Sequence, residues 1–222
     1  WGVSTRLIGG LIMTHSDDDG LVLPPKLAPN QVVCVPIYKT DDEKTLVYDY
    51  INTLVADLRK AGIRVRTDFR DQYKPGWKFA QHEVEGVPLR IAVGPRDVAN
   101  GVVELARRDT KTKVSTPIEG LTDVIQNLLV TIQNDLFETA KKRRSDMTTV
   151  VDSYDEFKKV LDEKGGFIYA HWDGTPETEE KIKEETKATI RCLPLVNPHK
   201  EPGVCIISGK PSKERVLFAR AY

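Results

Sequence analysis

Residues 31–62 read QVVCVPIYKTDDEKTLVYDYINTLVADLRKAG, and they decide the fold because they join a short apolar run to a long amphipathic one. The run QVVCVPI at 31–37 is rich in β-branched residues, which predicts a strand buried on both faces. Thr40 and Glu43 then form the capping-box pattern that begins a helix, and Gly62 ends it. The apolar residues between them recur at helical spacing: Leu46, Val47, Tyr50, Ile51, Leu54, Val55 and Leu58.

The alternation of strands and helices continues downstream. Further strands are predicted at GIRVRTD (62–68), LRIAVG (89–94) and VVELARRD (102–109). A long amphipathic helix follows at 121–144, and its four last cations suit the negative end of the helix dipole. This order predicts an α/β fold for residues 29–146, with a mixed or mostly parallel sheet and flanking helices.

Two segments flank that predicted sheet. Residues 2–15 combine apolar and small residues, which predicts a strand, or a strand leading into a helix, before a polar turn. Three prolines in LVLPPKLAP (21–29) predict an extended connector and a domain boundary near Ala28. After residue 146 the pattern restarts with a capping box at Ser153 and Glu156, so residues 147–222 are expected to form a small α+β domain.

The composition excludes several classes of protein. The 222 residues carry 33 Lys or Arg and 33 Asp or Glu, and the apolar fraction of 40% excludes disordered and fibrous chains. No apolar stretch is long enough to span a membrane, and no signal peptide is recognisable, so we expect a cytoplasmic protein without membrane contact. The three widely spaced cysteines suit a reducing compartment.

Positive charge gathers in one region of this neutral chain. Residues 59–113 contain 13 Lys or Arg against 7 Asp or Glu. Aromatic rings lie among cations there, and such an arrangement can bind RNA, because unpaired bases stack on the rings and on the guanidinium planes. The residues concerned are Arg70, Tyr73, Lys74, Trp77, Lys78 and Phe79. The alternative interpretation is a solvated strand face beside core aromatics.

No self-contained active site is recognisable. The sequence has no HExxH pair, no G-x-S-x-G elbow and no Gly-rich phosphate loop. Aspartates at 17–19 lack the spacing of a calcium loop, so a metal site is the minor interpretation there. Arg6 follows small hydroxyl residues in the predicted strand, and its guanidinium could bind phosphate oxygens or be an ordinary surface group.

Long blocks of the sequence resemble a known family. The first 33 residues, WGVSTRLIGGLIMTHSDDDGLVLPPKLAPNQVV, are similar to the third signature motif of class II prolyl-tRNA synthetases running into their anticodon-binding domain. RTDFRDQYKPGWKFAQHEVEGVPLRIAVGPRD (66–97) and SGKPSKERVLFARAY (208–222) resemble the archaeal and eukaryotic-type branch of that family. The likeness covers essentially the whole chain.

The resemblance implies roles for residues at the start of the chain. Arg6 matches the motif-three arginine that helps to hold ATP while the amino acid is adenylated, where its charge offsets the polyphosphate. Ser4 and Thr5 would lie against the same nucleotide. Trp1 and Gly2 would border the proline pocket.

The resemblance also implies an anticodon site. Glu83, Arg90 and Arg96 match positions expected to read the guanines of the proline anticodon. Arginine can bond the acceptor edge of guanine, and a carboxylate can accept from its amino and imino hydrogens. Ala92 departs from the pattern, because many relatives carry an acid there.

A second departure concerns zinc. Zinc-bearing relatives have two cysteine pairs in the C-terminal domain. Here the first pair is replaced around Trp172 and Glu177, and the second is reduced to Cys205 with Ser208. One thiolate cannot make a closed tetrahedral site, so we expect no structural zinc, with apolar packing around Trp172 in its place.

Together these matches imply three domains: the end of the catalytic domain (1–28), an anticodon-binding domain (29–146) and a C-terminal domain without the zinc cysteines (147–222). The full enzyme would be a homodimer that activates L-proline with ATP and Mg²⁺ and transfers it to tRNA(Pro). Motifs one and two are missing, so we expect this chain alone to be inactive. The alternatives are a non-catalytic RNA-binding accessory module and a structural α/β protein.

Overall fold

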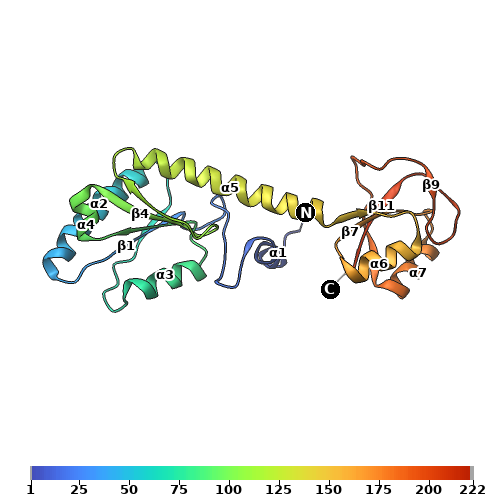
Figure 1. Cartoon of the computed structure of the whole chain (residues 1–222), viewed down its shortest axis with the longest axis horizontal. Coiled ribbons are helices and arrows are strands. Elements are labelled where there is room, and N and C mark those ends of the chain that lie inside the picture. Colours follow the sequence, from blue (N-terminus) through green and yellow to red (C-terminus); the bar gives the residue numbers. More distant parts are fainter. Residues whose placement is uncertain (1, 221–222) are drawn as a thin grey trace. The chain divides into compact units, whose positions relative to one another are not determined.

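The chain divides into two compact units, Trp1–Ala140 and Lys141–Tyr222. The structure is a computed structural model that describes residues 2–220 (Figure 1). The described part of the segment 1–28, expected to be the end of a separate domain, belongs to the first unit. None of the helices between residues 2 and 220 is long and apolar enough to cross a membrane.

A five-stranded sheet forms the centre of the first unit. Its strands, given in chain order, are β1 (Val32–Pro36), β2 (Val65–Thr67), β3 (Leu89–Val93), β4 (Val102–Arg107) and β5 (Lys113–Pro117). The spatial order is β2-β1-β3-β4-β5, with β1 parallel to β2 and β3 and the other pairs antiparallel. The predicted mixed sheet is confirmed. Strand β5 was not predicted, because it is exposed and has no apolar alternation.

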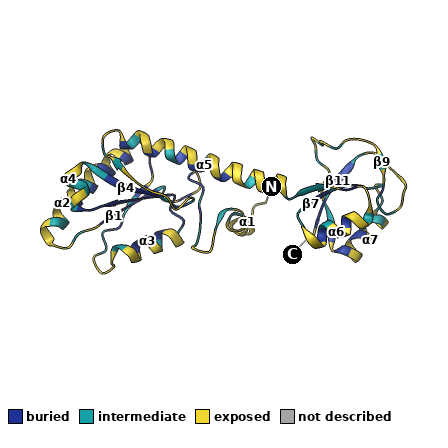
Figure 2. Cartoon of the chain, viewed as in Figure 1, coloured by how far each residue is buried: buried dark blue, intermediate teal, exposed yellow. Residues whose placement is uncertain are grey.

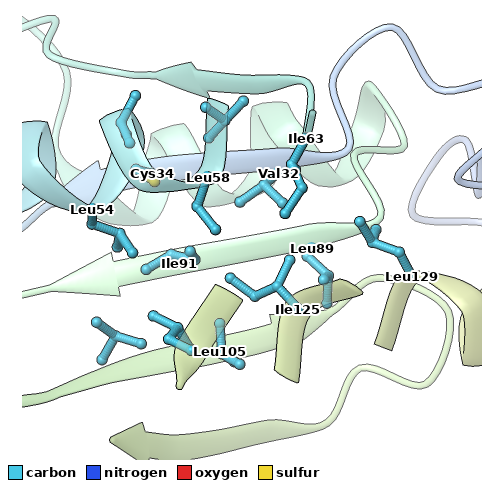
Figure 3. Close-up of a cluster of buried hydrophobic side chains, with 14 of the residues drawn as sticks. Val32, Cys34, Leu54, Leu58, Ile63, Leu89, Ile91, Leu105, Ile125 and Leu129 are labelled. Carbon is cyan, nitrogen blue, oxygen red and sulfur yellow. The ribbon is translucent and has the colours of Figure 1, made fainter. Parts of the chain in front are cut away.

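Helices cover both faces of this sheet. Side chains alternate along β1, so Val32 and Cys34 join the core made with α2 (Asp41–Lys60) and α5 (Leu121–Asp146). Figure 3 shows part of this core, including Leu54 and Leu58 of α2 and Ile125 and Leu129 of α5. Val33 and Val35 point to the opposite face.

The opposite face carries the helix that builds the candidate site. Helix α3 (Pro75–Val84) packs there through Phe79, against Val33, Val35 and Val87. This helix was not predicted, although Pro75 at its first turn is a start signal for a helix. The short helix α4 (Pro95–Asn100) follows β3.

The predicted start and end of α2 are confirmed. Thr40 Oγ1 accepts a hydrogen bond from Glu43 N at 3.2 Å, and the Glu43 carboxylate accepts one from Lys39 N at 2.7 Å. The donor of the second bond is Lys39, the residue before the N-cap, whereas in a standard capping box it is the N-cap residue itself. Gly62 follows the helix with φ +80°, a conformation that favours glycine.

Of the two expectations for residues 2–15, the strand is wrong, and of the alternative, a strand leading into a helix, only the helix is present. Residues Arg6–His15 form α1, so Arg6 is the first residue of a helix. The apolar residues at 7, 8, 11 and 12 follow helical spacing, which the small residues between them obscured. No residue of α1 is buried (Figure 2), and exposed apolar side chains include Leu7, Ile8 and Met13.

The second unit is the expected small α+β fold. Its strands are β6 (Thr148–Val150), β7 (Phe167–His171), β8 (Ala188–Cys192), β9 (Gly203–Val204), β10 (Pro211–Ser212) and β11 (Arg215–Arg220). The main sheet has the order β6-β7-β11-β8, and β9 and β10 form a separate antiparallel ribbon. Helices α6 (Tyr154–Glu163) and α7 (Pro176–Thr186) share one apolar core with this sheet. The predicted cap is confirmed, because Ser153 Oγ accepts from Glu156 N at 3.2 Å.

The segment after α1 lies against the end of α3, backbone to backbone. Leu21 N donates to Val84 O at 3.1 Å, and Leu23 N donates to Gly86 O at 3.4 Å. Gly86 has φ +72°, and a Cβ added to it would lie 2.6 Å from Leu21 Cβ. This close approach therefore requires glycine at position 86.

Gly86→Ala is expected to lower the free energy of unfolding by at least about 2 kcal/mol, because alanine adds backbone strain and a steric clash. Gly76→Ala is the matched control, since Gly76 lies in α3 and an added Cβ meets no atom within 4 Å. That change should be neutral or stabilise by up to about 1 kcal/mol. Urea unfolding of both variants checks the prediction, and equal effects would contradict it.

Candidate nucleic-acid interface

A buried carboxylate holds α3 against the sheet. Asp68 follows β2 and is 1% exposed. Its side chain accepts hydrogen bonds from Arg70 Nε at 2.8 Å and Nη2 at 2.6 Å, and His82 Nε2 of α3 lies 2.9 Å from its Oδ2. Lys78 Nζ, also on α3, donates to the backbone carbonyl of Asp68 at 3.0 Å. Burial alone would raise the pKa of Asp68, but the bonds from Arg70 and His82 outweigh it and hold that pKa well below its ordinary value.

Arg90 lies under α3 on the same face of the sheet. It pairs in register with Val33 on β1, which packs toward α3, and its guanidinium carbon lies 3.6 Å from the ring centroid of Phe79. Nη1 donates to Glu104 Oε1 at 3.3 Å. Nη2 is buried and has no hydrogen-bond partner among the described residues. Burial accordingly lowers the pKa of Arg90. A buried donor without a partner costs about 1–3 kcal/mol, so this nitrogen is ready for a ligand acceptor.

Two adjoining cavities lie between the end of α3 and the end of β4. The smaller, about 20 Å³, is lined by both Arg90 and Glu83 and holds little more than one water. The larger, about 230 Å³, reaches Asp19, Lys111 and Lys113. The two share Glu83, Ala106, Arg107 and Arg108. Most of the lining cations are already paired with carboxylates, as Arg107 is with Asp109 and Asp135. Among the described residues, the buried donor that remains for a ligand acceptor is therefore Arg90 Nη2.

One wall of these cavities is fixed by the segment after α1. Arg108, 5% exposed, donates to both oxygens of Asp17, from Nη1 at 2.9 Å and from Nη2 at 2.5 Å, and from Nε to Glu83 O at 2.9 Å. The bond from Arg108 holds the pKa of Asp17 well below its ordinary value. Lys111 pairs with Asp19. Asp17 and Asp19 thus bind cations of the turn between β4 and β5.

The structure brings together two of the three predicted anticodon residues. Glu83, at the end of α3, and Arg90 line the same small cavity. Arg96 is exposed on α4 and lines neither cavity. Glu104, which was not predicted, supplies the carboxylate opposite Ala92, its register partner. Side chains alternate along VVELAR, the sequence of β4, so Glu104 lies on the face that carries Arg90. This alternation is the sequence signal from which Glu104 could have been predicted.

The aromatic residues of the basic region divide into two kinds. Phe79 packs between α3 and the sheet, over Arg90, as the alternative interpretation of core aromatics expected. Tyr73 and Trp77 are 36% and 46% exposed and stack on each other, with ring centroids 3.8 Å apart and an interplanar angle of 11°. Their π surfaces are therefore accessible to a ligand.

The residues expected to bind ATP lie together before and within the first turn of α1. Ser4 Oγ accepts a hydrogen bond from Arg6 N at 3.3 Å. Gly2, Ser4, Thr5 and Arg6 are all exposed. Trp1, expected at the proline pocket, lies outside the described residues. Their exposure leaves the Arg6 guanidinium accessible to an anion.

In the second unit, a hydrogen-bonded cluster joins the loop after β7 to the loop after β9. Asp173 Oδ1 accepts from Thr175 Oγ1 at 2.8 Å and from Thr178 Oγ1 at 2.7 Å. Asp173 Oδ2 accepts from Ser208 Oγ at 2.6 Å. Trp172 Nε1 donates to Thr175 O at 3.1 Å. Trp172 also packs against the apolar core of the second unit, so apolar contacts and these polar bonds hold the same loops.

The donors around this cluster do not fit a closed zinc site. Cys205 is buried, and Ser208 is already bonded to Asp173. Between residues 2 and 220 there is no group of three or more His, Cys, Asp or Glu side chains that could hold a metal ion. A tetrahedral zinc site needs four such ligands.

Comparisons with known proteins agree with this geometry. Residues 31–128 match the family model for an anticodon binding domain, and residues 154–222 match the model described as "Prolyl-tRNA synthetase, C-terminal". The chain is 60% identical to a proline-tRNA ligase of Cytophaga hutchinsonii, 58% to one of Christiangramia forsetii and 55% to one of Porphyromonas gingivalis, each over 222 residues. It spans 45% of the length of these relatives.

Asp68→Asn is expected to lower the free energy of unfolding by about 3 kcal/mol at pH 7. This is the lower end of the usual cost of breaking a buried ion pair, because the partner Arg70 is partly exposed and can be solvated. The pKa of Asp68 is lower in the folded state than in the unfolded state, where it is near 3.8. The ionised carboxylate therefore stabilises the folded state fully at pH values above about 4. This stabilisation is lost as the pH falls from about 4 toward the folded-state pKa. The difference between parent and variant should therefore shrink below pH 4.

Chemical unfolding at several pH values checks this prediction. Asp146→Asn is the matched control, because Asp146 is exposed and pairs with Lys142 on the helix surface, and its loss should be much smaller. A difference between parent and Asp68→Asn that stays constant from pH 7 to pH 3 would contradict the assignment.

Proposed function

Because the chain belongs to the prolyl-tRNA synthetase family, we propose that it is the part of a proline-tRNA ligase that chiefly binds the anticodon of tRNA(Pro). The observation that carries this proposal is the buried Arg90 Nη2, which lacks a partner among the described residues and belongs to a side chain that lines a cavity with Glu83. The accessory-module alternative is not favoured, because the relatives are named as ligases and match the whole chain.

The chemistry of guanine suits this pair of residues. Its O6 and N7 atoms accept hydrogen bonds from an arginine fork, and its N1 and N2 hydrogens donate to a carboxylate. Arg90 is held by Phe79 and Glu104, so little side-chain freedom is lost when a base binds. Arg96, exposed on α4, contacts the RNA outside the cavity in this proposal.

The remaining residues belong to the other activities of the full ligase. We propose that residues 1–28 are the end of the catalytic domain, 29–146 the anticodon-binding domain and 147–222 the C-terminal domain. The exposed apolar side chains of α1 support this division, since a surface of this kind needs a partner, and the relatives are about twice as long as this chain. Arg6, Ser4 and Thr5 would hold ATP, and Trp1 and Gly2 would border proline.

In the full enzyme, proline attacks ATP to give prolyl-adenylate and pyrophosphate, and the prolyl group then passes to the terminal ribose of the tRNA. ATP brings the Mg²⁺ that neutralises its phosphates, and Arg6 adds a fixed positive charge. The full enzyme is proposed to be a homodimer in the cytoplasm, where the free thiols of Cys34, Cys192 and Cys205 remain reduced. This chain alone is not expected to activate proline.

Arg90→Ala is expected to remove the preference for the native anticodon. The parent chain should bind a tRNA(Pro) transcript more tightly than a transcript with both anticodon guanines replaced, by tenfold or more, since each good bidentate contact discriminates by about 1–3 kcal/mol. The variant should bind both transcripts equally. Filter binding or fluorescence anisotropy at two salt concentrations measures the ratio.

Arg96→Ala is the matched control, because it also removes one arginine but leaves the cavity intact. It should weaken binding of both transcripts by the same factor and preserve their ratio. Equal and steeply salt-dependent binding of both transcripts by the parent would refute the assignment of Glu83 and Arg90.

We further propose that the Asp173 cluster does the structural work that zinc does in metal-bearing relatives. Asp173→Ala should then lower the free energy of unfolding by about 2 kcal/mol, because it leaves the hydroxyls of three residues without their charged acceptor. EDTA should leave the thermal midpoint unchanged. A midpoint that falls with EDTA and recovers with added zinc would contradict the proposal.

A further inference from the structure

A third cavity lies at the end of α3 away from Glu83 and Arg90. It measures about 310 Å³, within the range of ligand sites, and Tyr38, Asp71, Tyr73, Lys74 and Lys78 contribute to its lining. The last residue of β1 also lines it. It therefore lies at the carboxyl end of a parallel strand, the edge at which open α/β sheets bind ligands.

The cavity carries unused positive charge. Lys78 is only 2% exposed, and among the described residues its Nζ donates to one acceptor, the carbonyl of Asp68. The charge of Asp71 is already matched, because its carboxylate accepts from Lys44 Nζ at 2.5 Å and from the hydroxyls of Tyr38 and Tyr48 at 2.5 and 3.0 Å. These bonds, led by that from Lys44, hold the pKa of Asp71 at about 2. Lys74 and Lys78 thus remain to attract an anion.

An aromatic platform borders the cavity. Tyr73 lines the cavity and also stacks on Trp77. The Arg70 guanidinium carbon lies 5.1 Å from the Tyr73 ring centroid and 5.4 Å from that of Trp77. Arg70 is itself fixed by two bonds to Asp68. The exposed rings are therefore held in place before any ligand arrives.

We propose that the stacked pair Tyr73–Trp77 and the cavity beside it form a second nucleotide subsite, which takes an unpaired nucleotide of the same RNA loop. Its base stacks on the rings, and its phosphate binds Lys74 and Lys78. The subsite rests on the proposed function, because it assumes that RNA is the ligand of α3. A ten-residue helix is only about 15 Å long, so one RNA loop can contact both of its ends.

The subsite gives affinity without reading sequence. Every base has a π face, so stacking tolerates any base, whereas the side chains of Arg90 and Glu83 distinguish guanine by its edge. Substitutions at the two ends of α3 should therefore have separable effects. Loss of the platform should weaken binding of all RNA loops equally, and loss of Arg90 should remove the difference between them.

The test measures binding of the whole chain to two RNA stem-loops, one with the proline anticodon and one with both guanines replaced. Trp77→Ala should weaken binding of both about tenfold and leave their ratio unchanged. Trp77→Phe, which keeps an aromatic face, should recover most of the affinity. Val130→Ala, at an exposed apolar residue of α5, is the control and should leave both affinities unchanged.

Lys74→Ala provides a second readout that does not depend on the platform. It should lower the slope of log K against log salt by about 0.7, as expected for one lost phosphate contact to a single strand. The proposal is overturned if Trp77→Ala and Lys74→Ala leave both affinities and the slope unchanged, or if Trp77→Ala changes the ratio instead of the affinities. Uniform weakening by Trp77→Ala together with an unchanged ratio in Arg90→Ala would sustain the subsite and reject guanine recognition by Arg90.

Discussion

The buried carboxylate of Asp68 is the interaction on which the candidate site depends. Through His82 it fixes the end of α3 that carries Glu83, and through Arg70 it fixes the Tyr73–Trp77 pair. Its backbone carbonyl receives Lys78, so both ends of the helix are tied to the residue that follows β2. A buried charge stabilises a fold only when its partners are in place, and Asp68 therefore couples the position of α3 to its own ionisation.

Arg90 shows the opposite arrangement. Its guanidinium is buried against Phe79, and one nitrogen is left without a partner among residues 2–220. A protein selected for stability alone would gain by satisfying or removing that donor. The free-energy cost of this unpaired donor is explained if an RNA base supplies the missing acceptor. A donor that is already desolvated and fixed in position binds its ligand more strongly than a donor in water.

Sequence reasoning found the elements with clear periodicity and caps, such as β1, α2 and α5. It missed α3, where aromatic and charged residues obscure the apolar stripe, and for α1 it left a strand and a strand leading into a helix open. The family resemblance indicated Glu83 and Arg90. It gave no sign of Asp17 and Arg108, because their bond joins residues 91 positions apart and depends on the path of the connector.

The most direct test of this account is a crystal structure of the chain bound to an RNA stem-loop that carries the proline anticodon. The account predicts a guanine O6 or N7 atom about 3 Å from Arg90 Nη2, with the same base in contact with Glu83. A complex in which the anticodon bases lie elsewhere, with Arg90 Nη2 bonded only to water, would contradict it.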